Sequence, residues 1–72
     1  MGNYIQSANE KIRDVRQGGY MEGEELRILN RTIETYEATL ANNKRLNRVS
    51  LENENSDIVQ ALNILRDERN RF

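Results

Sequence analysis

Apolar residues recur every three or four positions between residues 24 and 41, which predicts an amphipathic α-helix there. The residues between them are mostly charged or polar, and Ile28 is the one large apolar exception. The same spacing defines the a and d positions of a coiled coil, where helices pack along a shared apolar seam. We therefore interpret five residues of this helix as a protein-interaction seam: Leu26, Leu29, Ile33, Tyr36 and Leu40.

A second apolar stripe near the C-terminal end predicts another helix over residues 56–70. Additional apolar residues beside the stripe make its apolar face broad, so we expect this helix to pack against more than one neighbour. Asn and Ser side chains at residues 53–56 are suited to starting a helix, because they accept hydrogen bonds from its first amides. The stripe extends the predicted interaction seam by Ile58, Leu62 and Leu65.

The polar stretch between the two stripes leaves two interpretations open. Leucines at positions 29, 40, 51 and 62 are eleven residues apart, a repeat that one continuous coiled-coil helix can adopt. Asn43 and Asn47 would then occupy seam positions and set the register and the number of chains. Alternatively, the chain turns at residues 41–43 or within residues 52–56 and forms a helical hairpin. The very polar composition of residues 52–56 favours the turn there, after a long helix over residues 24–51.

A short helix is predicted over residues 7–17. Ser7 and Glu10 have the spacing of a capping box, in which each side chain accepts a hydrogen bond from an amide of the first turn. The Gly18-Gly19 pair suits a left-handed helix end and predicts a break. Upstream, Gly2 resembles an N-myristoylation site, but position 6 holds Gln6 where that signal has Ser or Thr.

Composition predicts an all-α fold in a single domain spanning residues 1–72. The chain has no Pro, and no segment shows the alternation typical of a half-buried strand. It also has no Cys and no His, which removes disulfides, thiolate nucleophiles and the commonest general base and metal ligand. We therefore expect no enzymatic activity and no metal or cofactor. A chain this short has a small core, so a partner chain would add stability.

Charge alternates in blocks along the chain. Residues 22–40 hold five Glu and two Arg, residues 41–51 hold three cations and no acid, and residues 52–57 hold three acids. Such alternation suits antiparallel or staggered pairing of helices. The basic block could contact phosphates, but the flanking acids and the net charge of −1 disfavour nucleic acid. No long apolar run or signal-peptide pattern is present, which disfavours a membrane role and favours an intracellular or virion-internal location.

Two function classes fit these features. The first is a helical coiled-coil assembly protein, a small structural or scaffold subunit that self-associates as a homo-oligomer or laces larger subunits together, as minor virion components do. The second is a regulatory adaptor or inhibitor that lays an amphipathic helix into a groove of another protein. An adaptor would leave one apolar stripe exposed, and we expect that stripe to be the one beginning at Ile58.

Overall fold

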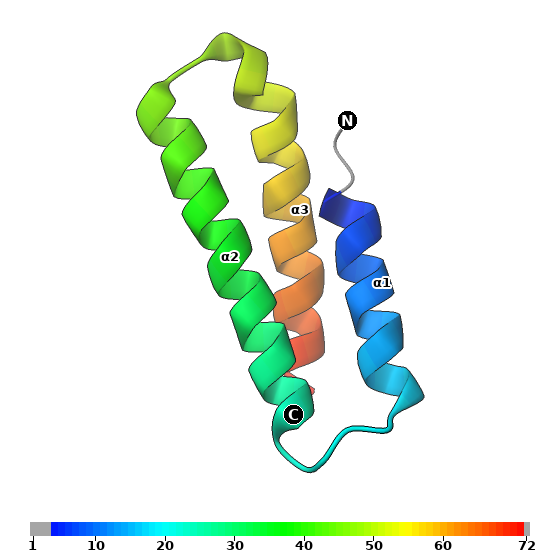
Figure 1. Ribbon diagram of the computed structural model, residues 1–72. Helices are drawn as coiled ribbons and strands as arrows, with labels where there is room; N and C mark the ends of the chain where they lie inside the picture. Colours follow the sequence, from blue (N-terminus) through cyan, green and yellow to red (C-terminus); the bar gives the residue numbers. More distant parts are fainter. Residues whose placement is uncertain (1–3, 72) are drawn as a thin grey trace.

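Three helices form nearly all of the part of the chain that the structure, a computed structural model, describes: residues 4–71 (Figure 1). They are α1 (Tyr4–Gln17), α2 (Glu24–Leu46) and α3 (Glu52–Arg69), and a short 3-10 turn, η1 (Val49–Leu51), precedes α3. No β-strand occurs within residues 4–71, so the predicted all-α class is confirmed. The possible lipidation site at Gly2 lies outside the described residues.

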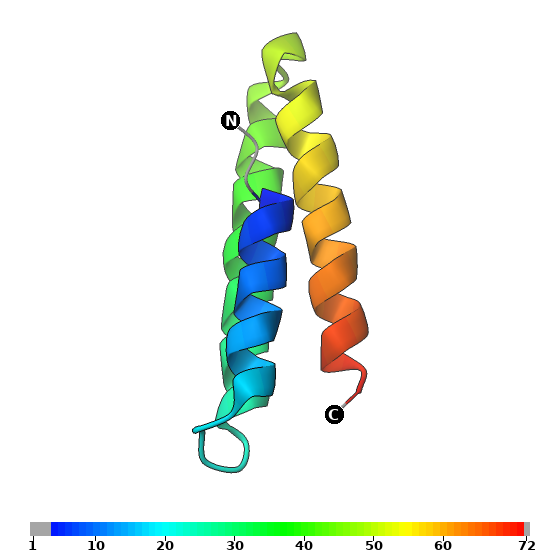
Figure 2. The same ribbon diagram turned by 90° about the vertical axis from the view of Figure 1, so that its right-hand side faces the viewer.

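The helices form an elongated bundle in which α2 runs antiparallel to α1 and α3 (Figure 1). Most contacts between elements join α3 to α1 or α3 to α2, whereas α1 and α2 contact each other little. Figure 2 shows α1 in front of α2, with α3 to the side of both. The broad apolar face predicted for the last helix therefore packs against two neighbours. The core consists of Ala8, Val15, Leu29, Ile33, Ile58, Ala61, Leu62 and Leu65.

Helix α1 begins earlier than the capping box predicted. It starts at Tyr4, so Ser7 lies within the helix and is exposed. The ring of Tyr4 packs edge-on against that of Tyr36 in α2, with 5.4 Å between the ring centroids. Tyr4 and Ile5 are both half-buried, and this burial explains why the helix extends beyond the point where local capping would start it.

The connection from α1 to α2 contains three glycines with left-handed backbone conformation. Helix α1 ends at Gln17, and Gly18 and Gly19 follow with φ values of 86° each. Gly23, with φ of 89°, stands immediately before α2. Residues with a Cβ adopt this conformation only with strain, so glycine at these positions lets the chain reverse direction in a short connection.

The second reversal lies between the two places that the sequence suggested. Helix α2 ends at Leu46, five residues earlier than predicted, and the chain has already turned when it reaches residues 52–56, which are the start of α3. Asn47 adopts the left-handed conformation with φ of 51°, and its amide donates to the carbonyls of Asn43 and Lys44. Asn tolerates this conformation better than most residues, which allows it to end α2 without glycine. The continuous long helix is therefore absent from the described residues.

Candidate interaction surfaces

The predicted interaction seam lies mainly inside the chain. Leu29, Ile58 and Leu65 are fully buried, and Ile33 and Leu62 are each 2% exposed. Tyr36 and Leu40 are half-buried against this core. Leu26, near the start of α2, is 37% exposed and is the one member of the predicted seam that stands outside the core.

Antiparallel packing of α2 on α3 explains this outcome. Each helix has one apolar stripe, and the reversal at Asn47 turns the two stripes toward each other. The stripe of α3 beginning at Ile58, expected to stay free in an adaptor, is buried between α1 and α2 instead. An intermolecular contact in this fold must therefore use residues other than the buried seam.

The two asparagines predicted to set register have different roles in the fold. Asn43 is 7% exposed, and its Nδ2 donates to Oε2 of Glu54 at 2.6 Å. This contact joins the last turns of α2 to the first turn of α3. Asn47 instead ends α2. Burial raises the pKa of Tyr4 in α1, and the Glu54 carboxylate contributes to the rise. Polar groups from all three helices thus meet at this end of the bundle.

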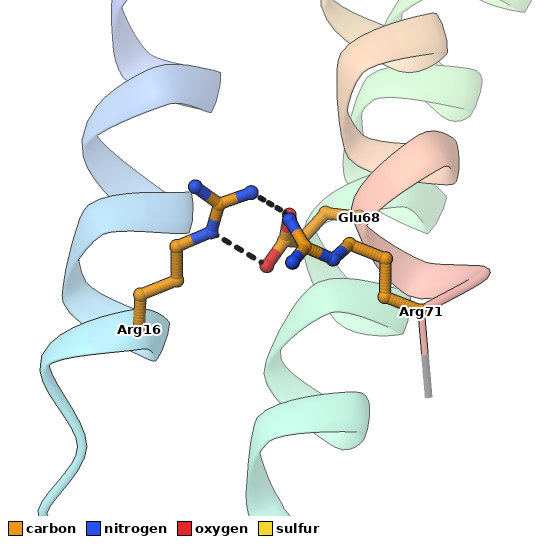
Figure 3. A network of polar contacts seen from close by, with 3 residues as sticks. All are labelled: Arg16, Glu68 and Arg71. Atoms are coloured by element: carbon orange, nitrogen blue, oxygen red, sulfur yellow. Dashed lines mark hydrogen bonds and ion pairs between the residues drawn. The ribbon is translucent and has the colours of Figure 1, made fainter.

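An ion pair at the opposite end joins α1 to α3 (Figure 3). Arg16 donates from Nε to Oε2 of Glu68 at 3.0 Å and from Nη2 to Oε1 at 2.6 Å. Arg71 approaches the same carboxylate at 3.7 Å. Glu68 is 5% exposed, and the hydrogen bonds from Arg16 hold its pKa below its usual value against the opposing effect of burial. This bidentate geometry fixes the position of α1 on α3.

Sequence reasoning missed this pair, although a signal existed. Glu68 lies three residues after Leu65 on the buried side of α3, so the apolar stripe ends in a carboxylate. A buried acid needs a cation, and Arg16 in the last turn of α1 supplies it. Periodicity alone could not identify which of the eleven Lys and Arg residues would pair with Glu68.

Two further polar contacts join α2 to α3. Arg66 of α3 donates to Glu37 of α2, and Arg69 donates to the side-chain oxygen of Asn30. No three Cys, His, Asp or Glu side chains within residues 4–71 converge to hold a metal ion. None of the helices in this part of the chain is long and apolar enough to cross a membrane.

Apolar side chains remain on the surface of the α2–α3 hairpin. At its tip, Leu46 is 47% exposed and Val49 is 79% exposed. Along its side, Val59 is 42% exposed and borders a groove between the two helices. The two leucines, which are buried or half-buried, form the floor of this groove, and charged residues form its rim. The lining residues are Glu37, Leu40, Ala41, Lys44, Val59, Leu62 and Arg66.

The side of α2 opposite the core also presents small apolar residues. Ala38 and Ala41 are exposed there and line a shallow, open depression together with Asn42 and Arg45. Glu34 lies one turn before Ala38 on the same side of the helix and is exposed as well. We call Glu34, Ala38, Ala41 and Arg45 the outer face of α2.

Comparison of the chain with protein-family models, curated protein sequences and solved structures found no match. Proposals about function therefore start from the surface of the bundle itself, and above all from the exposed apolar residues of the α2–α3 hairpin.

Proposed function

We propose that the chain is a non-enzymatic assembly module, a small structural subunit that acts by associating with copies of itself. One observation carries this proposal. The apolar stripes of α2 and α3 are buried in the core, yet other apolar residues are exposed on the surface of the same hairpin. Single exposed apolar residues are common on any protein, but a grouped set rimmed by charges is typical of a contact surface.

The α2–α3 groove and the depression on the outer face of α2 support an interaction role more than a catalytic one. They are open to solvent and lie along helix sides, where a second helix can pack. Catalytic carboxylates need a concave site that shields one of them from water. The acids that line the α2–α3 groove and the outer face of α2, Glu37 and Glu34, are both exposed.

The alternating charge blocks are consistent with pairing between copies. Helix α2 carries Glu34 and Glu37 in its middle and Lys44 and Arg45 in its last turn. A second copy running in the opposite direction brings acid against base at both ends of the contact. Exposed pairs of this kind contribute roughly 0.2–1 kcal/mol each, so they select orientation and apolar contact supplies most of the affinity.

Sedimentation equilibrium over a wide concentration range tests the proposal. We expect the 8.5 kDa chain to reach one discrete oligomer as concentration rises and to dissociate on dilution. Thermal unfolding should shift to higher temperature with concentration, because association stabilises only the folded chain. A monomer at every concentration would refute self-association.

The α2–α3 groove favours a second candidate function, a regulatory adaptor. Its apolar floor and charged rim suit an amphipathic helix of another protein. A monomeric chain that captures such a partner, and loses it when Val59→Asp places a charge in the groove, would support the adaptor. Val59 is 42% exposed, so this substitution should leave the fold intact.

A further inference from the structure

The outer face of α2 has a regular arrangement that the core does not explain. Its four residues are spaced by four, three and four positions, so they form one line along the helix. The line lies on the opposite side of α2 from the buried residues Leu29 and Ile33, and all four residues are exposed. At a rise of about 1.5 Å per residue, it is roughly 16 Å long.

The two alanines at the centre of the line permit close approach of another helix. Their side chains are the smallest that still offer apolar surface, and helices pack at about 8–10 Å depending on the side chains between them. Ala38 and Ala41 stand in a shallow depression rather than on a ridge. A flat or complementary helix surface can therefore enter between the longer side chains at either end.

The charged residues at the two ends of the line indicate which helix can pack against the outer face of α2. Glu34 precedes the alanine pair by four residues, and Arg45 follows it by four residues. When a second copy of α2 lies antiparallel, Ala38 faces Ala41 and Glu34 faces Arg45, and the twofold axis repeats both contacts. A parallel copy would instead place Glu34 against Glu34 and Arg45 against Arg45. The outer face is thus complementary to itself in one orientation only.

The charged ends are available for this contact. No ion pair within residues 4–71 involves Glu34 or Arg45. Arg45 donates to the side-chain oxygen of Asn42 at 2.9 Å, which holds its guanidinium beside the depression.

We propose that two copies of the chain pair through the outer faces of α2 in this antiparallel register. The proposal rests on the self-association proposed above and assigns one contact surface to it, which is separate from the exposed apolar residues Leu46, Val49 and Val59. The contact surface is one helix wide, which is small compared with the roughly 800 Å² that each partner buries in a standard interface. The dimer is therefore reversible, and of the residues that line the α2–α3 groove it covers Ala41.

Charge exchange at the two ends tests the register. Glu34→Arg places arginine against Arg45 at both ends of the dimer, and Arg45→Glu places glutamate against Glu34. We expect each single variant to dimerise at least about tenfold more weakly than the original chain in sedimentation equilibrium. An equimolar mixture of the two variants should recover the dimer as a heterodimer, and the double variant should recover it as a homodimer.

Matched controls separate this contact from a general effect of charge. Asp14→Arg and Arg13→Glu make the same changes in charge at exposed positions of α1, and neither should weaken the dimer. Far-UV circular dichroism and urea unfolding check that every variant keeps its fold.

The outcomes distinguish pairing through the outer faces of α2 from self-association in general. An oligomer that tolerates both single variants, or a mixture that stays dissociated, overturns the α2 pairing and leaves self-association standing. An original chain that is monomeric at every concentration overturns both.

Discussion

The hydrogen bond between Asn43 and Glu54 should couple the ends of α2 and α3 measurably. The Nδ2 to Oε2 distance of 2.6 Å is short, as expected when the acceptor is ionised, and Asn43 is 7% exposed. Asn43→Ala removes the donor, and Glu54→Ala removes the acceptor. The double variant removes both, so the three variants and the original chain form a thermodynamic cycle.

The expected coupling free energy follows from this geometry. Hydrogen bonds to charged groups contribute about 1.5–3 kcal/mol to stability. Glu54 is only half-buried, and water that reaches its carboxylate weakens the contact, so we expect about 1–2 kcal/mol of coupling. The interaction of Glu54 with the N-terminal end of α3 is present whether or not Asn43 is replaced, and it cancels in the cycle.

Urea unfolding followed by far-UV circular dichroism measures all four free energies. Glu52 provides the matched control, since it also lies in the first turn of α3 but is exposed. A cycle that pairs Asn43→Ala with Glu52→Ala should be additive within about 0.5 kcal/mol. If the effects of the Asn43 and Glu54 substitutions were also additive within this margin, the hydrogen bond would contribute no stability and the predicted coupling would be wrong.

Three further predictions concern the core, the turn and the ion pair. Leu29→Ala, at a fully buried site, should lower the free energy of unfolding by about 2–5 kcal/mol in urea titrations, and Leu26→Ala, 37% exposed, by clearly less. Asn47→Ala should lower the melting temperature because alanine tolerates the left-handed φ of 51° less well than asparagine does, whereas Asn47→Gly should not. Arg16 lowers the pKa of Glu68, so the folded chain holds a proton on this carboxylate less readily than the unfolded chain does. The ion pair therefore stabilises the fold above about pH 4.5, and this stabilisation is lost as the pH falls below that value. Glu68→Gln should therefore lower stability near pH 7 and flatten its decline in acid, as measured by urea unfolding across that range; an unchanged decline would contradict the role of the pair.

The sequence was informative about which residues are buried. The spacing of Leu29, Ile33, Ile58 and Leu65 marked one side of each helix, and those side chains form the core. Periodic spacing indicates that a helix has an apolar side that becomes buried. It does not report whether the covering surface belongs to another chain or to the next helix of the same chain.

The place of the second turn was harder to predict for a physical reason. Asn47 ends α2 through its backbone conformation, and no Gly or Pro marks the position. The polar residues 52–56 resembled a loop because Asn and Ser are poor formers of helix interiors. They form the first turns of α3, where Glu52 and Glu54 interact favourably with the helix dipole. The apolar pattern did not indicate the outer face of α2, because alanine is common on both the buried and the exposed sides of helices.

The central position of α3 has a consequence for how the bundle opens. Helix α1 contacts α3 and has little contact with α2, so it can detach while the α2–α3 hairpin stays closed. Loss of α3, by contrast, removes the packing surface of both other helices at once. Amide hydrogens of α1 should therefore exchange with solvent through a partial opening, and those of α3 only when the whole chain unfolds.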